Sequence, residues 1–228
     1  MPKLGWSPSQ QPHNQYAGGG TGYTDSEQYW MELLAAECHK QWVEQRTGIP
    51  DIVLEAGSWK DNALASNRAG VTHHVAQHTN AGGGVGLEIF HHANSPEGKR
   101  MADVLYKHLA PATDTPDRGV KASTKYGELN QTNAKAVIIE YQFHDSLAGA
   151  AEIRRSIKEF ATATVKAMCE FYGKTYTAPV KYVPPTRTFL KAMIHLDSVD
   201  RAHYERAAAE KGDFIKFEPT IEDSFKSW

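Results

Sequence analysis

The sequence lacks most features that mark secreted, membrane or nucleic-acid-binding proteins. Its 228 residues carry a formal net charge of only −2, which gives no electrostatic reason to bind nucleic acid or an anionic membrane. No apolar run approaches the roughly 18 residues that a membrane-spanning helix needs. The first residues show no charged segment followed by an apolar one, the pattern of a signal peptide. We therefore expect a protein made in a cytoplasm, with no membrane insertion and no nucleic-acid partner.

Cysteine is almost absent as well. The two cysteines, Cys38 and Cys169, lie on apolar stripes of predicted helices and form no close-spaced ligand pair. This placement favours buried, reduced thiols over a disulfide.

What the chain does contain is an alternation of strand-like and helical patterns. Thr24 and Glu27 match a capping box that opens a helix running to about Gln45, and residues 1–23 read as a loop. Further helices are expected at 62–69, from Ser95 onward and around 153–168, and strands at 52–54, 75–78, 87–90 and 136–141. Such alternation predicts an α/β layered domain over residues 1–175.

A proline-containing stretch, residues 176–188, reads as a semi-rigid linker. Residues 189–228 then show a strand–helix–strand pattern, which predicts a small βαβ-like appendage. About 40 residues bury little core alone, so this module is expected to pack on the α/β domain, to dimerise, or both.

Four residues form a candidate catalytic set: His13, Glu27, His78 and Glu140. Two imidazoles and a carboxylate with an open fourth position are typical of catalytic zinc, and a free carboxylate beside them can move protons. Taken singly, each has an ordinary explanation: a solvated loop histidine, a capping carboxylate, a satisfied strand histidine and an edge carboxylate. Because Glu140 ends an apolar run, where α/β sheets place their sites, the combination favours a zinc hydrolase.

The chain resembles the type 3 N-acetylmuramoyl-L-alanine amidases, particularly their phage endolysin branch, over roughly residues 5–172. The resemblance rests on a series of motifs in matching order: Ser7-Pro-Ser-Gln-Gln-Pro-His13-Asn14, Glu27, His78-Thr-Asn80-Ala81, Gly86-Leu-Glu-Ile-Phe90, Asp117-Arg-Gly-Val-Lys121 and Ile138-Ile-Glu140-Tyr-Gln-Phe143-His144-Asp145. One departure is Gln77, which precedes His78 where the family has an apolar residue.

The resemblance implies roles for these residues. His13, Glu27 and His78 would bind one zinc ion per chain, and Glu140 would be the catalytic carboxylate. The implied fold is a twisted, mostly parallel sheet with helices on both faces. The implied reaction cleaves the amide between N-acetylmuramic acid and L-alanine in bacterial peptidoglycan.

Three further residues are candidates for binding substrate or supporting a ligand. Asn80 and His144 flank the two site strands and are candidates for orienting substrate or hydrogen-bonding a ligand, and Arg68 for contacting a carboxylate of the stem peptide.

The resemblance also implies a biological role. A phage lysin without a signal peptide would accumulate in the host cytoplasm and reach the wall after the membrane is breached. The C-terminal module would then bind the wall or form a homodimer. Two alternatives remain at this stage: a zinc carboxypeptidase-like peptidase, and a non-catalytic wall-binding protein.

Overall fold

The computed structural model describes residues 1–116 and 118–178, which form a six-stranded sheet with helices on both faces. The strands lie in the order β2-β1-β3-β6-β4-β5, and all neighbours are parallel except the antiparallel pair β4 and β6. The α/β fold class with a mostly parallel sheet is therefore confirmed. The strands are β1 Leu4–Pro8, β2 Asp51–Val53, β3 His73–Asn80, β4 Glu88–His92, β5 Val120–Ser123 and β6 Lys135–Phe143. The helices are α1 Glu27–Glu44, α2 Trp59–Arg68, α3 Pro96–Leu109, α4 Gly127–Gln131 and α5 Leu147–Phe171.

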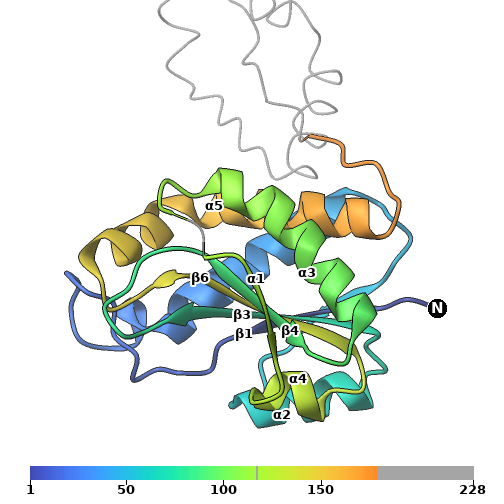
Figure 1. The fold of residues 1–228 in the computed structure, drawn as a ribbon, viewed down its shortest axis with the longest axis horizontal. Coiled ribbons are helices and arrows are strands. Elements are labelled where there is room, and N and C mark those ends of the chain that lie inside the picture. Colours follow the sequence, from blue (N-terminus) through green and yellow to red (C-terminus); the bar gives the residue numbers. More distant parts are fainter. Residues whose placement is uncertain (117, 179–228) are drawn as a thin grey trace, which may run out of the picture. The chain divides into compact units, whose positions relative to one another are not determined.

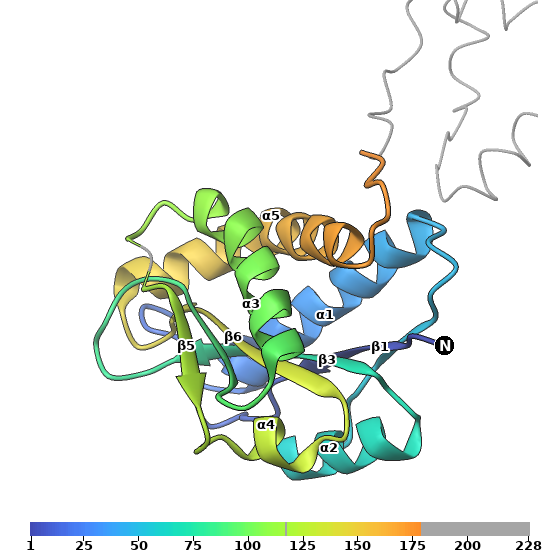
Figure 2. The ribbon, with the colours of Figure 1, turned by 45° about the vertical axis from the view of Figure 1, so that its right-hand side comes forward.

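The helices divide into two layers. Helices α1, α3 and α5 cover one face of the sheet, and α2 and α4 cover the other (Figure 1). The view in Figure 2 shows the same three-layer arrangement from the side of α3 and β5. Most of the apolar core lies under the larger layer, where α3 buries Met101, Leu105 and Leu109 as its helical spacing predicts. A smaller cluster under α2 and α4 contains Ala76, Leu129, Ala136 and Ile138.

The central strands are buried on both faces. In β6 every residue from Ala136 to Ile139 is buried, rather than every second one, which is the pattern of a strand with helices on both sides.

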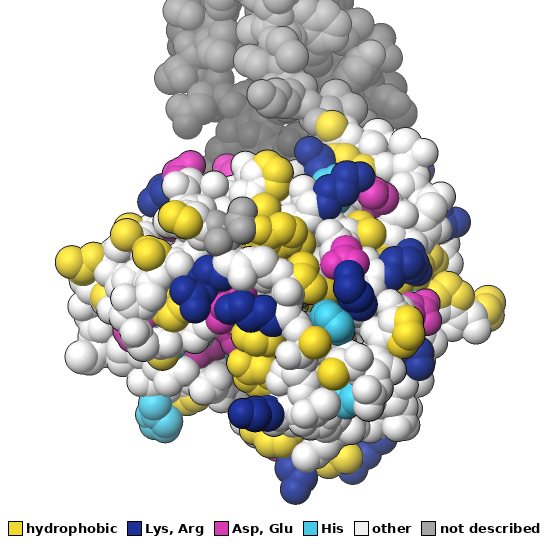
Figure 3. Space-filling model, in the orientation of Figure 1, with side chains coloured by type: hydrophobic (Ala, Val, Ile, Leu, Met, Phe, Trp, Pro, Cys, Tyr) yellow, Lys and Arg dark blue, Asp and Glu magenta, His cyan; other side chains and the backbone are white. Residues whose placement is uncertain are grey.

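On the outer surface, Lys and Arg side chains are interspersed with Asp, Glu and apolar ones over the face shown in Figure 3. No helix of residues 1–116 or 118–178 is long and apolar enough to cross a membrane.

The prediction that residues 1–23 are a loop was wrong at its start. Leu4 to Pro8 form β1, a fully buried strand between β2 and β3. Its sequence, Leu-Gly-Trp-Ser-Pro, contains Gly and Pro, which are rare in strands. Pairing with β2 and β3, rather than intrinsic strand propensity, therefore decides its conformation. The short elements β5 and α4 were also missed, because four or five residues carry little periodic signal.

The first helix begins differently from the predicted capping box. Thr24 lies in a 3₁₀ turn, η1 (Tyr23–Asp25), and the N-cap is Ser26, whose hydroxyl accepts a hydrogen bond from the backbone N–H of Tyr29 at 3.2 Å. Glu27 is therefore the first helical residue, and its carboxylate is not used as a capping group.

Both cysteines are free and buried, as expected. The predicted appendage, residues 189–228, and most of the predicted linker lie outside the described residues.

Gln77, the departure noted in the sequence, is fully buried on the face covered by α1 and α5. Its amide nitrogen lies 3.4 Å from both the Cys38 sulfur and the Tyr141 hydroxyl, and the latter also contacts the Thr164 hydroxyl at 2.9 Å. Its Oε1 atom has no hydrogen-bond partner among the described residues. Gln77 is thus a partly satisfied polar residue in an otherwise apolar layer.

We expect Gln77→Met to raise the free energy of unfolding by about 1 kcal/mol, because it removes a buried acceptor without a partner and leaves an unbranched chain of similar length. Thr164→Val is the control with the opposite expected effect, because it removes the nearest hydrogen-bond partner of the buried Tyr141 hydroxyl. It should lower the free energy of unfolding by about 1–3 kcal/mol. Urea denaturation measures both; a destabilised Gln77→Met protein would contradict the assignment of Oε1 as unsatisfied.

Candidate functional site

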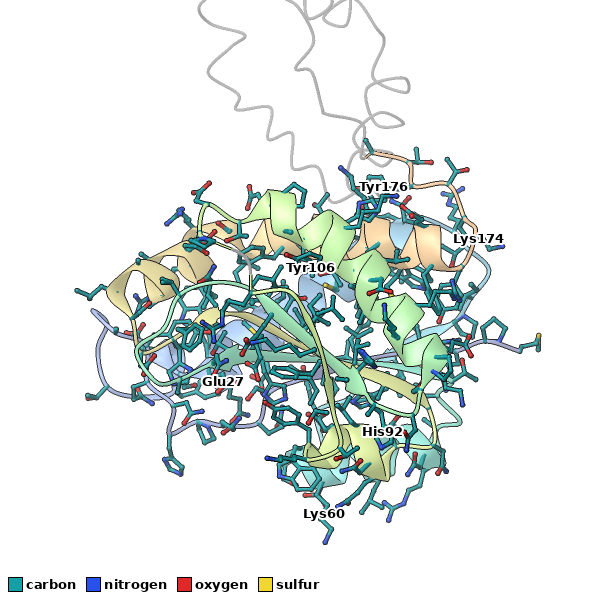
Figure 4. The ribbon with its side chains drawn as sticks, in the orientation of Figure 1. Glu27, Lys60, His92, Tyr106, Lys174 and Tyr176 are labelled. Atoms are coloured by element: carbon teal, nitrogen blue, oxygen red, sulfur yellow. The ribbon has the colours of Figure 1, made fainter. Side chains whose placement is uncertain are left out.

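The site lies where β3 and β6 run side by side toward their carboxyl ends. His78 in β3 is paired in register with Glu140 in β6, so the two side chains occupy the edge at which α/β sheets bind ligands. The amino end of α1 reaches the same edge and places Glu27 there, as the stick view shows (Figure 4). His78 Nδ1 and Glu27 Oε1 are 3.1 Å apart. Two of the three predicted metal ligands are therefore in contact.

Glu27 is fully buried and held by several donors. Its Oε1 accepts from the backbone N–H of Thr79 at 3.1 Å, and its Oε2 accepts from Asn14 Nδ2 at 2.6 Å. Burial opposes ionisation, but the bonds from His78, Asn14 and Thr79 outweigh it and lower the pKa of Glu27. Its place at a helix amino terminus also favours the anion. Glu27 is thus a fixed carboxylate, the form that binds a metal.

His13 does not complete the set in this structure. Its side chain is exposed on a turn, while the residues around it reach the site: Asn14 bonds to Glu27, and Gln11 Nε2 lies 3.5 Å from His78 Nδ1. Within residues 1–116 and 118–178, no group of three or more His, Cys, Asp or Glu side chains has the arrangement of a metal site. The turn brings the backbone of His13 to the site edge, but its imidazole lies outside.

Glu140 differs from Glu27 in its hydrogen bonding. Its Oε2 is sealed from solvent and has no hydrogen-bond partner in the described part of the chain. Burial, with the charges of Glu27, Glu88 and Glu128 adding to it and that of His78 opposing it, raises the pKa of Glu140 to about 7. A carboxyl group with this pKa can accept and return a proton near neutral pH, as a general base and acid must.

Glu128, on α4, is a site residue that the sequence analysis missed. Its Oε2 lies 2.9 Å from His78 Nε2, and its Oε1 accepts from Ser7 Oγ at 2.8 Å and lies 3.2 Å from His74 Nε2. Burial opposes ionisation, but the contacts with His74 and His78 lower the pKa of Glu128 to about 2. The short α4 segment carried no helical periodicity, and no signal in the sequence linked it to His78.

Asn80 lies near the site, but its amide is engaged. Its Nδ2 donates to Glu88, which faces Glu140 across the β4–β6 pair and also contacts Arg118 and Lys121. Asn80 therefore helps to hold the buried Glu88 carboxylate and its two partly exposed cations beside Glu140.

His144 is buried against Thr79 and Tyr16, and Arg68 lies at the end of α2. His144 is 5% exposed, its Nδ1 lies 3.1 Å from Thr79 Oγ1, and its ring stacks on Tyr16. The contact between His144 and Thr79 holds the loop after β6 against β3. Arg68 ends α2, just before β3 begins at His73, and five residues of strand, about 16 Å, separate His73 from His78. A role of either residue in binding substrate or supporting a ligand stays a prediction.

A cavity of about 590 Å³ opens elsewhere, between α1, α5 and the end of α3. Charged side chains of both signs line it, including Lys40, Lys107 and Glu159, and none of the site residues described above takes part. The chemistry of Glu140 and His78, rather than cavity size, therefore identifies the site.

The residues present fit a zinc ion in kind. Zinc binds imidazole nitrogen and carboxylate oxygen, the atoms that His78 and Glu27 present to each other. Three carboxyl groups, Glu27, Glu128 and Glu140, surround the His78 imidazole, and one of their oxygens lacks any described partner. A bound divalent cation would compensate this negative charge. His13, the third predicted ligand, would have to turn its imidazole inward to join them.

The pKa of Glu140 makes a prediction about stability in metal-free protein. Between pH 4.5, the ordinary pKa, and about 7, the folded chain keeps a proton on Glu140 that the unfolded chain has released. Stability therefore falls as pH rises through this window. Glu140→Gln cannot ionise, so above pH 7 it should be more stable than the wild type by roughly 1–3 kcal/mol, with the difference vanishing near pH 4.5. Urea titrations in the presence of a chelator measure this; a difference that does not vary with pH would contradict the raised pKa.

Comparison with known proteins agrees with the fold. The sequence model of the N-acetylmuramoyl-L-alanine amidase family matches residues 51–170, which contain His78 and Glu140 but not His13 or Glu27. No curated protein sequence matches the chain.

Several solved structures are similar along most of the described chain. The catalytic domain of CwlV, an N-acetylmuramoyl-L-alanine amidase from Bacillus (Paenibacillus) polymyxa, is 17% identical with a TM-score of 0.63, and the match covers 77% of this chain and 100% of that one. The amidase from Clostridium difficile 630 is 16% identical with a TM-score of 0.67, over 76% and 97%. The catalytic domain of the CD27L endolysin, which targets Clostridia difficile, is 18% identical with a TM-score of 0.61, over 78% and 100%. With more than half of its sequence matched by the family model, the chain belongs to the N-acetylmuramoyl-L-alanine amidase family.

Proposed function

We propose that the chain is a zinc-dependent peptidoglycan amidase that cleaves the bond between N-acetylmuramic acid and L-alanine. The observation that carries the proposal is the pairing of Glu140 with His78 across β3 and β6, beside Glu27. This arrangement places Glu140, whose pKa is raised to about 7, next to an imidazole and a carboxylate of the kinds that bind zinc. Membership of the amidase family supports the choice of substrate.

Glu27 and His78 would hold the metal with His13. Such a zinc ion supplies Lewis acidity, which polarises an amide carbonyl and acidifies water. The ligand that the structure leaves to be tested is His13, since only its neighbours Gln11 and Asn14 contact the other two.

Glu140 carries the proton transfers. As water attacks the amide carbon, the Glu140 carboxylate accepts a proton from it; as the carbon–nitrogen bond breaks, the same group donates that proton to the departing amine of L-alanine. A pKa near 7 suits both steps, because neither protonation state is strongly favoured. Glu27 and Glu128, with lowered pKa values, remain anionic throughout.

We expect Glu140→Gln to keep one zinc per chain and to lose about 10²- to 10⁴-fold in turnover, the usual contribution of a general base. His78→Ala should lose stoichiometric zinc and activity together. Metal analysis and mass spectrometry of digested peptidoglycan provide the readouts. The wild-type digest should contain new L-alanine amino termini and no new reducing sugars.

Two outcomes would contradict these assignments. Loss of zinc in Glu140→Gln would make Glu140 a metal ligand, and full zinc retention after removal of both His13 and His78 would exclude the proposed site. Release of terminal amino acids from the stem peptide would instead indicate a carboxypeptidase.

The same proposal extends to host lysis by a phage. The fold is shared with an endolysin catalytic domain and equally with bacterial amidases. Because the fold does not distinguish these two roles, a lysis experiment is needed to test the phage role. Protein produced in a bacterial cytoplasm should leave the cells intact until the membrane is permeabilised, and the culture should then clear. Clearing that needs no permeabilisation would contradict the role.

Residues 189–228 are proposed to bind the wall or to dimerise. Deleting residues 180–228 leaves the compact unit Met1–Pro179. We expect the shortened chain to hydrolyse soluble muropeptides at the wild-type rate and to bind whole walls more weakly. Co-sedimentation with walls and light scattering measure the two possible roles; unchanged wall affinity and unchanged mass would contradict both.

A further inference from the structure

The two ring nitrogens of His78 have different carboxylate partners. Nδ1 lies 3.1 Å from Glu27 Oε1, and Nε2 lies 2.9 Å from Glu128 Oε2. Glu27 is a predicted metal ligand, whereas Glu128 has no role in the reaction proposed above. Glu128 is 4% exposed. Burial of a charged carboxylate is costly unless its partners compensate the charge, so its contacts indicate the role it has.

We propose that Glu128 is the positioning residue for His78, holding the Nε2–H so that Nδ1 is the nitrogen that faces Glu27 and binds the metal. The inference rests on the proposed zinc site. A neutral imidazole has one N–H and one lone pair, so a nitrogen that donates to a carboxylate is not the one that binds a metal. A carboxylate in this position fixes the tautomer and ring orientation of the ligand and strengthens it as a donor.

Glu128 is itself held by two contacts besides the one with His78. Its Oε1 accepts from Ser7 Oγ at 2.8 Å and lies 3.2 Å from His74 Nε2, and Ser7 Oγ in turn accepts from Asn62 Nδ2 at 3.1 Å. Ser7, Asn62 and His74 are all fully buried. Because both carboxylate oxygens are engaged, the group cannot turn away from His78 without breaking a buried hydrogen bond, which is costly.

The backbone of α4 is fixed as well. The Glu128 carbonyl accepts from Thr132 Oγ1 at 2.6 Å, and Leu129 packs into the small core cluster. Trp59 of α2 lies so close to Gly127 that a Cβ there would meet its ring at 2.2 Å. Helix α4 is therefore held between α2 and the sheet, and its carboxylate is presented from a rigid element, as precise placement of a ligand requires.

A purely structural role for this buried cluster makes a different prediction. In that case removing the Glu128 charge would change stability and would leave zinc affinity of the folded protein unaltered. Zinc affinity and thermal midpoint, measured on the same full-length variants, therefore separate the two roles.

The decisive variant is Glu128→Gln, which keeps an oxygen able to accept the Nε2–H and removes the charge. Competition with a chromophoric chelator should show zinc affinity reduced about 10- to 100-fold, with one ion still bound per chain. The visible spectrum of the cobalt-substituted variant should keep the wild-type ligand pattern. Glu152→Gln is the matched control, since Glu152 is 1% exposed and accepts from Thr113 Oγ1 and Asp114 N, away from His78. It should bind zinc as the wild type does.

Unchanged zinc affinity in folded Glu128→Gln would overturn the inference, and loss of all stoichiometric zinc would do so too, because Glu128 would then be a ligand. If Glu128→Gln does not fold, Ser7→Ala removes one anchor of the carboxylate and should weaken zinc binding by a smaller factor; no change would again overturn the inference. Failure of the wild type to bind zinc would reject the proposed function itself. Wild-type binding that His78→Ala abolishes and Glu128→Gln leaves intact would reject only the positioning role.

Discussion

The parallel pairing of β3 with β6 is the constraint on which the site depends. Its register sets His78 beside Glu140, and a slip of one strand by one residue would turn one of the two side chains to the opposite face of the sheet. The apolar neighbours in these strands, such as Val75 and Val137, are fully buried under the larger helical layer. Burial of the hydrophobic face therefore fixes the positions of the two reactive groups.

Three carboxyl groups lie around this pair: Glu27 and Glu128 are buried, and Glu140 is half-buried. Glu27 accepts from a backbone amide and an asparagine, and Glu128 accepts from a serine and faces two histidines. Glu140 Oε2 has no donor among the described residues, so nothing comparable offsets the burial that raises the pKa of Glu140. The difference in hydrogen bonding, more than the difference in burial, separates two permanent anions from a group that exchanges protons near neutral pH.

His78 joins these carboxyl groups into one unit. Its two nitrogens face Glu27 and Glu128, so the sheet, the start of α1 and the short α4 meet at a single imidazole. Burial lowers the affinity of His78 for a proton, but the two carboxylates outweigh it and raise its pKa well above the ordinary value. Metal-free protein therefore holds a cationic imidazole at the place where the proposed zinc ion would supply the positive charge, and zinc binding should release a proton.

The sequence by itself determined the long elements and the reactive residues that end them. The apolar spacing of α1, α3 and α5 and the buried run of β6 were strong enough to read directly, and His78 and Glu140 were found as polar residues in or after such runs. Tertiary structure alone decided the short elements. Strand β1 and helix α4 have five residues each and little intrinsic preference, so they form because residues far along the chain pack or pair with them. Glu128 meets Ser7 across 121 residues and His78 across 50, and no local pattern encodes a contact at that separation. The contact between His144 and Thr79 likewise joins residues 65 positions apart, and only the folded chain brings them together.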